Sequence, residues 1–158
     1  MRSSTGGFGT YIKGPSTSCL VDWNSFKLPN VVLSSMEGEV SSIQVATKSA
    51  IHAKMLADLM LGIEMPLNNG LYESGTPMVM RADALSAIKS IKKAFSTRVR
   101  HMRRTLGISI SWLNRTWSER HGSWLVHHPG RFLAADSMTK ALDRELLRGH
   151  ERAMGVVT

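Results

Sequence analysis

The stretch Ser34-Ser35-Met36-Glu37-Gly38-Glu39-Val40 opens the longest regular pattern in this chain of 158 residues. Ser34 followed three residues later by Glu37 fits a capping box, in which the serine side chain accepts a hydrogen bond from the first helical turn. Apolar or small side chains then recur at helical spacing up to Gly62, which predicts one long helix with an alanine-rich face suited to close packing on a sheet. The members of that face are Val40, Ile43, Ala46, Ala50, Ala53, Ala57 and Met60.

The residues before this helix alternate strand-forming residues with turn formers. Phe8–Lys13 is predicted to be a strand, Gly14-Pro15-Ser16 a turn, and Cys19–Trp23 the returning strand of a hairpin. A third short apolar run, Val31–Leu33, follows Pro29-Asn30.

The residues after the long helix predict further strands and helices. Met78–Ala82 and Trp124–His127 are predicted strands, and the first of them ends at Asp83. Two predicted helices carry apolar stripes. The stripes are Leu85, Ile88, Ile91 and Phe95, and then Val99, Met102, Leu106, Ile110, Leu113 and Trp117. Helical segments are also expected over Ala134–Leu142 and Arg144–Met154. This order predicts a mixed α/β fold with helices packed on a sheet.

Composition narrows the class of protein. Hydrophobic residues make up 42% of the chain and charged residues 20%, which predicts a single folded domain over residues 1–158. The lone cysteine, Cys19, excludes an internal disulfide framework and a cysteine-based zinc cluster. No apolar run approaches the ~20 residues of a membrane span, and the N-terminus lacks the apolar core of a signal peptide. We therefore expect an intracellular protein without a membrane partner.

The net charge of +8 favours a polyanionic partner, such as nucleic acid or an anionic membrane surface. The excess is local, because no acid interrupts the basic residues between positions 89 and 104. These candidate phosphate-binding residues are Lys89, Lys92, Lys93, Arg98, Arg100, Arg103 and Arg104. A solvated helix face is the alternative interpretation.

Three acidic residues fall where α/β folds build sites. Glu39 lies near the start of the long helix, Asp83 ends a predicted strand, and Asp136 begins a helical segment after the last strand. If the three carboxylates converge they repel one another and need a cation, and oxygen ligands select Mg²⁺ or Mn²⁺. The alternative is that single acids at helix starts only complement the helix dipole.

At these residues the sequence resembles the ribonuclease H domain at the C-terminal end of the polyprotein of copia-type LTR retrotransposons. The similar blocks occur in family order and cover nearly the whole chain. They are Ser4-Thr5-Gly6-Gly7-Phe8 with Trp23, Leu33-Ser34-Ser35-Met36-Glu37-Gly38-Glu39, Asp83-Ala84-Leu85-Ser86-Ala87-Ile88, Thr97-Arg98-Val99-Arg100-His101-Met102, and Ala135-Asp136-Ser137-Met138-Thr139-Lys140-Ala141-Leu142.

The resemblance implies a ribonuclease H-like mixed sheet and hydrolysis of the RNA strand of an RNA–DNA hybrid with two Mg²⁺ or Mn²⁺ ions. It also implies a reverse transcriptase domain as partner in the parent polyprotein. The family's catalytic, metal-binding carboxylates map onto Glu39, Asp83 and Asp136. Related nucleases place a mobile histidine near the last acid, which makes His128 or His127 a candidate for proton transfer; a surface histidine beside a Pro-Gly turn is the alternative.

Other residues have two interpretations each. His101 matches a histidine of the family, but packing or hydrogen bonding explains it as well. Trp112, Trp117 and Trp124 are of a type that stacks on bases, although Trp117 lies on an apolar stripe and is expected in the core.

The sequence also departs from the family. Met1 stands almost against the first block, so the family's central first strand and its catalytic Asp are expected to be missing, leaving an N-terminally truncated domain with two unpaired strand edges. Ala84-Leu85 replaces the family's Asn-Gln pair. We therefore expect weak or no nuclease activity from this chain alone. The alternatives are a non-catalytic nucleic-acid-binding remnant of the same fold, and a fused or mispredicted chain that does not fold alone.

Overall fold

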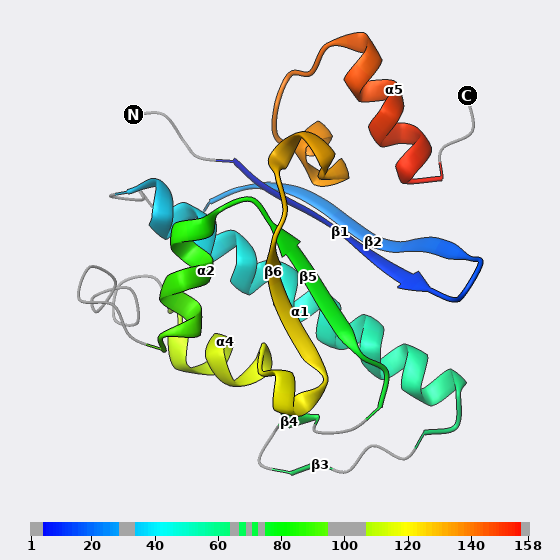
Figure 1. The fold of residues 1–158 in the computed structure, drawn as a ribbon, viewed down its shortest axis with the longest axis vertical. Coiled ribbons are helices and arrows are strands. Elements are labelled where there is room, and N and C mark those ends of the chain that lie inside the picture. The colour runs from blue at the N-terminus through cyan, green and yellow to red at the C-terminus, as the bar shows by residue number, and fades with distance from the viewer. Residues whose placement is uncertain are drawn as a thin grey trace.

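A computed structural model describes residues 5–28, 34–63, 67–68, 71–72, 75–94 and 107–155. Helices and strands follow one another along the chain, which confirms the mixed α/β class (Figure 1). The predicted strand Val31–Leu33, and the predicted core positions Phe95, Val99, Met102 and Leu106, lie outside the described residues. No described helix combines the length and the apolar character that crossing a membrane requires.

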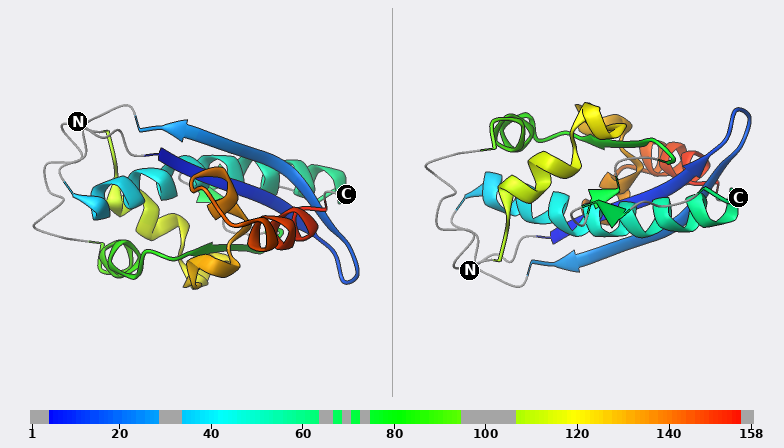
Figure 2. Two further views of the ribbon diagram at one scale, coloured as in Figure 1. Left: turned by 90° about the horizontal axis from the view of Figure 1, so that it is seen from above. Right: turned by 90° about the horizontal axis from the view of Figure 1, so that it is seen from below.

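The predicted long helix is present as α1 (Ser35–Met60) and runs along most of the molecule (Figure 2). Its start is capped as predicted, since the Glu37 N–H donates to Ser34 Oγ at 3.3 Å. Val40, Ile43 and Ala57 on the predicted face are buried. Met60 is wrong as a core residue, because it is 76% exposed in a last turn that the described elements leave uncovered.

The predicted hairpin is present and longer than expected. Strands β1 (Thr5–Lys13) and β2 (Ser18–Lys27) pair antiparallel, with Thr5 opposite Lys27 and a register shift between Thr10 and Tyr11. β1 packs on α1. The Thr10 and Ser49 hydroxyl oxygens lie 2.8 Å apart and join the strand to the helix.

Strands β5 (Met78–Ala82) and β6 (Ser123–His127) pair in parallel, with Met78 opposite Ser123 and Ala82 opposite His127. Two further short strands, β3 (Leu67–Asn68) and β4 (Leu71–Tyr72), pair with each other. The described strands thus form three two-stranded sheets, and the expected single mixed sheet is not continuous, because no described strand joins β1–β2 to β5–β6.

The core lies between α1, β5–β6 and two shorter helices, α2 (Leu85–Lys92) and α4 (Ile110–Thr116). Trp117 is buried as predicted, and its Nε1–H donates to Thr47 Oγ1 at 2.9 Å. The buried apolar cluster comprises Val40, Ile43, Ala87, Ile88, Ile91, Ile108, Leu113, Trp117 and Leu125.

The expected continuous helix ending at Trp117 is wrong in its described part. Residues 107–109 are not helical, because Gly107 has a φ of +64°. Ser109 begins a new helix instead, and its Oγ accepts a hydrogen bond from the Trp112 N–H at 3.2 Å. The apolar spacing of the sequence continues through residues 107–109, so periodicity alone did not reveal that they are not helical.

The C-terminal part contains three 3-10 turns, η2 (Glu119–His121), η3 (Gly130–Phe132) and η4 (Ala134–Met138), followed by helix α5 (Arg144–Ala153). The helix predicted over Ala134–Leu142 is therefore only a short 3-10 turn. The helix predicted over Arg144–Met154 is confirmed, and the Asp143 carboxylate caps it by accepting from the N–H groups of Glu145 and Leu146.

Candidate functional site

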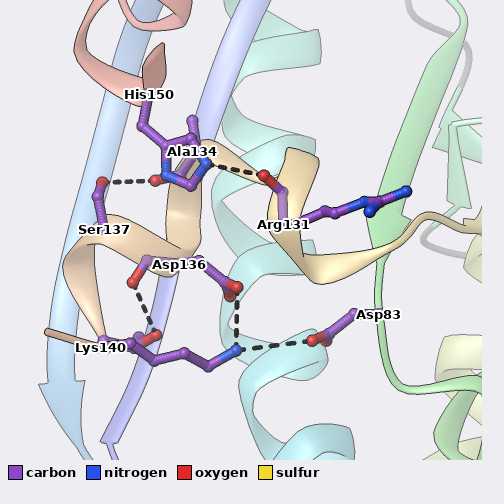
Figure 3. A network of polar contacts seen from close by, with 8 residues as sticks. Asp83, Arg131, Ala134, Asp136, Ser137, Lys140 and His150 are labelled. Atoms are coloured by element: carbon purple, nitrogen blue, oxygen red, sulfur yellow. Dashed lines mark hydrogen bonds and ion pairs between the residues drawn. The ribbon is translucent and has the colours of Figure 1, made fainter. Parts of the chain in front are cut away.

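Two of the three singled-out acids meet beyond the end of the β5–β6 pair. Asp83 directly follows β5, and Asp136 lies on η4, which follows β6 through η3. Figure 3 shows the Lys140 side chain reaching toward both carboxylates. Its Nζ lies 3.0 Å from Asp136 Oδ2 and 3.8 Å from Asp83 Oδ2. We call Glu39, Asp83 and Asp136 the acidic pole.

Glu39 belongs to the same electrostatic cluster. As a residue it is exposed, but protein atoms surround part of its carboxyl group. This partial burial raises the pKa of Glu39, the negative charges of Asp83 and Asp136 raise it further, and the positive charge of Lys140 opposes them. The acidic pole therefore draws on α1, the end of β5 and η4.

Lys140 is held in its charged form. The hydrogen bond from its ammonium group to Asp136 raises the pKa of Lys140, and the charges of Asp136, Asp83 and Glu39 act in the same direction against partial burial. The local chain conformation places it there, because the Lys140 N–H also donates to the Asp136 carbonyl oxygen at 2.9 Å.

Gly130 lies close to both aspartates of the acidic pole. A Cβ built on Gly130 would lie 2.8 Å from Asp83 Oδ2 and 3.0 Å from Asp136 Oδ2. A side chain at this position would displace at least one carboxylate, so glycine allows the η3 main chain to pass close to both. His150, which is buried, fixes the same turn from α5 through a 3.1 Å hydrogen bond between its Nε2 and the Arg131 carbonyl oxygen.

The acidic pole does not fit the Mg²⁺ or Mn²⁺ that the resemblance implies. Within the described residues, no group of three or more His, Cys, Asp or Glu side chains is arranged to hold a metal ion. The ammonium group of Lys140 instead contacts Oδ2 of both aspartates.

His128 lies beside the pole without a described contact to its carboxylates. Its main-chain N–H donates to the carbonyl oxygen of Ala82, the residue before Asp83, at 2.8 Å. Its ring packs against the Phe132 ring at a centroid distance of 6.0 Å. The observed contact of the ring is thus one of packing, and the proton-transfer role stays a prediction.

The basic segment is only partly described. Lys89 and Lys92 lie on α2, Lys93 is its C-terminal cap, and all three are exposed. Cations here also complement the negative end of the helix dipole, which is the simpler explanation of their position. The other candidates, Arg98, Arg100, Arg103 and Arg104, lie outside the described residues, and so does His101.

Sequence reasoning named Lys140 within a matched block but gave it no role, and it missed the role of Gly130. The signal for Lys140 was its spacing of four residues from Asp136, which brings opposite charges together on one helical turn. No comparable signal marked Gly130, because its role depends on a close approach to Asp83 from a distant part of the chain.

We compared the chain with known proteins, and no protein-family model, curated protein or solved structure matches it.

Proposed function

We propose that this chain is a ribonuclease H-like domain derived from a copia-type retrotransposon, and that by itself it hydrolyses RNA–DNA hybrids weakly or not at all. The supporting observation is the acidic pole, where Asp83 and Asp136 meet around Lys140. These are two of the positions at which the resemblance places catalytic carboxylates.

The order of elements also supports the proposal. A hairpin, a long helix and a parallel strand pair with helices around it are what the resemblance implies for this part of the domain. Hydrolysis by the intact family uses four carboxylates and two metal ions, whereas the resemblance maps only three carboxylates onto this chain. Two of them, those of Asp136 and Asp83, have the Lys140 ammonium group at 3.0 Å and 3.8 Å.

Within this proposal the chain binds nucleic acid rather than cleaving it. The exposed cations Lys89, Lys92 and Lys93 are suited to phosphate groups of a nucleic acid. A non-catalytic nucleic-acid-binding remnant of the fold, our second candidate, is favoured by the ion pair at the acidic pole.

Incubation with a labelled RNA–DNA hybrid in Mg²⁺ or Mn²⁺ tests the proposed activity. We expect the hybrid to be bound and to remain essentially uncut, because the carboxylate set does not fit two metal ions. Asp83→Asn is the control variant. Clear cleavage by the natural chain that disappears in this variant would show that the acidic pole is catalytically competent and would refute the proposed impairment.

The salt dependence of binding tests the role of α2. Replacing Lys89, Lys92 and Lys93 with glutamine is expected to weaken hybrid binding and to flatten the dependence of log affinity on log salt by up to about three, near one for each lost phosphate contact. Fluorescence anisotropy of a labelled hybrid, recorded between low and moderate salt, measures the affinity and its salt dependence. The matched control replaces Arg144, Arg148 and Arg152, exposed cations of α5. Equal effects of the two triple variants would mean that net charge, and not α2, determines binding.

A further inference from the structure

We propose that Lys140 is the resident cation of the acidic pole, and that its ammonium group excludes divalent metal ions by binding the carboxylate oxygens that such an ion would need. The proposal deepens the proposed function because it concerns the same site. It predicts a cation-binding property that is measurable without any nucleic acid.

The contacts place one positive charge between two negative ones. Lys140 Nζ is 3.0 Å from Asp136 Oδ2 and 3.8 Å from Asp83 Oδ2 (Figure 3). The Asp136 side chain is 16% exposed and that of Asp83 is 37% exposed, so water screens the nearer carboxylate less. A charge-assisted hydrogen bond to a partly buried carboxylate is stronger than one between neutral groups.

The two oxygens that Lys140 contacts are also those that Gly130 approaches. A Cβ on Gly130 would meet Asp83 Oδ2 and Asp136 Oδ2 on the side of the η3 main chain. The two oxygens therefore have the η3 main chain and the Lys140 ammonium group as close neighbours. A divalent ion binding both oxygens at 2.0–2.6 Å would compete directly with the ammonium group.

Removing the ammonium charge changes which cation the pole favours. Without Lys140 the carboxylates of Asp83 and Asp136 face each other without their common counter-ion, and Glu39 adds a third negative charge nearby. Carboxylates that repel one another attract a small divalent cation most strongly. In the variant Lys140→Met the new side chain is of similar length but carries no charge. A metal ion can then take the place of the ammonium group beside the two carboxylates.

Manganese binding to the Lys140→Met variant tests the proposal. The probe is MnCl₂ alone, and the free ion is measured by electron paramagnetic resonance during titration of the full chain. We expect Mn²⁺ to bind about tenfold or more tightly to Lys140→Met than to the natural chain. Lys140→Arg, which keeps the charge, and Lys48→Met, at an exposed position of α1, are expected to bind Mn²⁺ as the natural chain does.

A second readout and a second set of variants keep the test decisive. Added Mn²⁺ is expected to raise the melting temperature of Lys140→Met more than that of the natural chain, because the ion binds the folded state. The gain should disappear in Lys140→Met with Asp136→Asn. If Lys140→Met does not fold, Lys140→Gln takes its place. Equal Mn²⁺ affinity of the natural chain and the uncharged variants, or a gain that survives loss of Asp136, overturns the proposal.

The outcome separates this proposal from the proposed function. Tighter Mn²⁺ binding without any hybrid binding would support Lys140 as the resident cation and reject the nucleic-acid role. Hybrid binding together with an Mn²⁺ affinity that is unchanged in Lys140→Met would support the nucleic-acid role and reject Lys140 as the resident cation.

Discussion

Replacing Asp58 with alanine should lower the free energy of unfolding by about 3–5 kcal/mol, the range for removing one partner of a buried ion pair. Asp58 is fully buried in α1, and Lys54, one helical turn earlier, is 4% exposed. Lys54 Nζ lies 3.3 Å from Asp58 Oδ2. The variant leaves the lysine charge buried without its carboxylate, and urea unfolding followed by circular dichroism measures the loss.

The same carboxylate holds the segment that leads into β5. Asp58 Oδ1 accepts hydrogen bonds from the Thr76 N–H at 2.6 Å and from Thr76 Oγ1 at 2.5 Å. Lys54 Nζ donates to the Thr76 carbonyl oxygen at 2.7 Å. Since Thr76 precedes β5 by two residues, this network anchors the strand that ends at Asp83. The loss in Asp58→Ala thus reports on the attachment of β5 to α1.

Two comparisons identify the cause of that loss. Lys54→Met combined with Asp58→Leu removes both charges and should be less destabilised than Asp58→Ala alone, because neither charge of the pair is then left buried without the other. Glu119→Ala, at an exposed position, should stay within about 0.5 kcal/mol of the natural chain. An Asp58→Ala variant as stable as Glu119→Ala would contradict the buried pair.

The contribution of Asp58 should also depend on pH in a defined direction. Burial raises the pKa of Asp58, but the hydrogen bonds from Thr76 and the charge of Lys54 outweigh burial and hold the pKa below its ordinary value. The unfolded chain therefore binds this proton first. The stabilisation is complete above about pH 4, the ordinary aspartate pKa, and is lost as the pH falls through the lower folded value. The stability difference between the natural chain and Asp58→Asn should shrink in that range.

The face of α1 shows what periodicity predicts and what it misses. Val40, Ile43 and Ala57 were predicted correctly, because a helix that packs on a sheet buries its apolar stripe. Thr47, Lys54 and Asp58 are also buried, although they are polar. Lys54 and Asp58 pair with each other within the helix, but their other partner, Thr76, and the partner of Thr47, Trp117, lie outside it. A pattern within one helix contains no information about such partners, so these positions were not predictable.

The acidic pole was partly predictable for a related reason. Asp83 and Asp136 stand at the ends of elements, and parallel strands bring their carboxyl ends to one edge of a sheet. Sequence position therefore indicated that they meet. Sequence position did not indicate the counter-ion of the two carboxylates, because a metal ion and a lysine ammonium group can both balance their negative charge. The structure adds the position of Lys140 Nζ, close to both aspartates.

Replacing Leu113 with alanine should cost about 2–5 kcal/mol, since it deletes a fully buried side chain and leaves a cavity that neighbouring groups fill only partly. Leu113 lies on α4 and belongs to the cluster that includes Ile91 of α2 and Leu125 of β6. It joins three elements that are separated in sequence, so its loss weakens their mutual packing. The midpoint of urea unfolding measures the effect.

Leu59→Ala is the matched control, because the same atoms are removed from a leucine that is 68% exposed on α1. Its effect should stay within about 0.5 kcal/mol. The difference between the two leucines then measures burial alone. If both variants unfold at the same urea concentration, α4 is not docked on α2 and β6 as described. If Leu113→Ala alone is destabilised, the helices and the parallel strands that lead to the acidic pole share one core, and the position of Asp83 relative to Asp136 rests on that core.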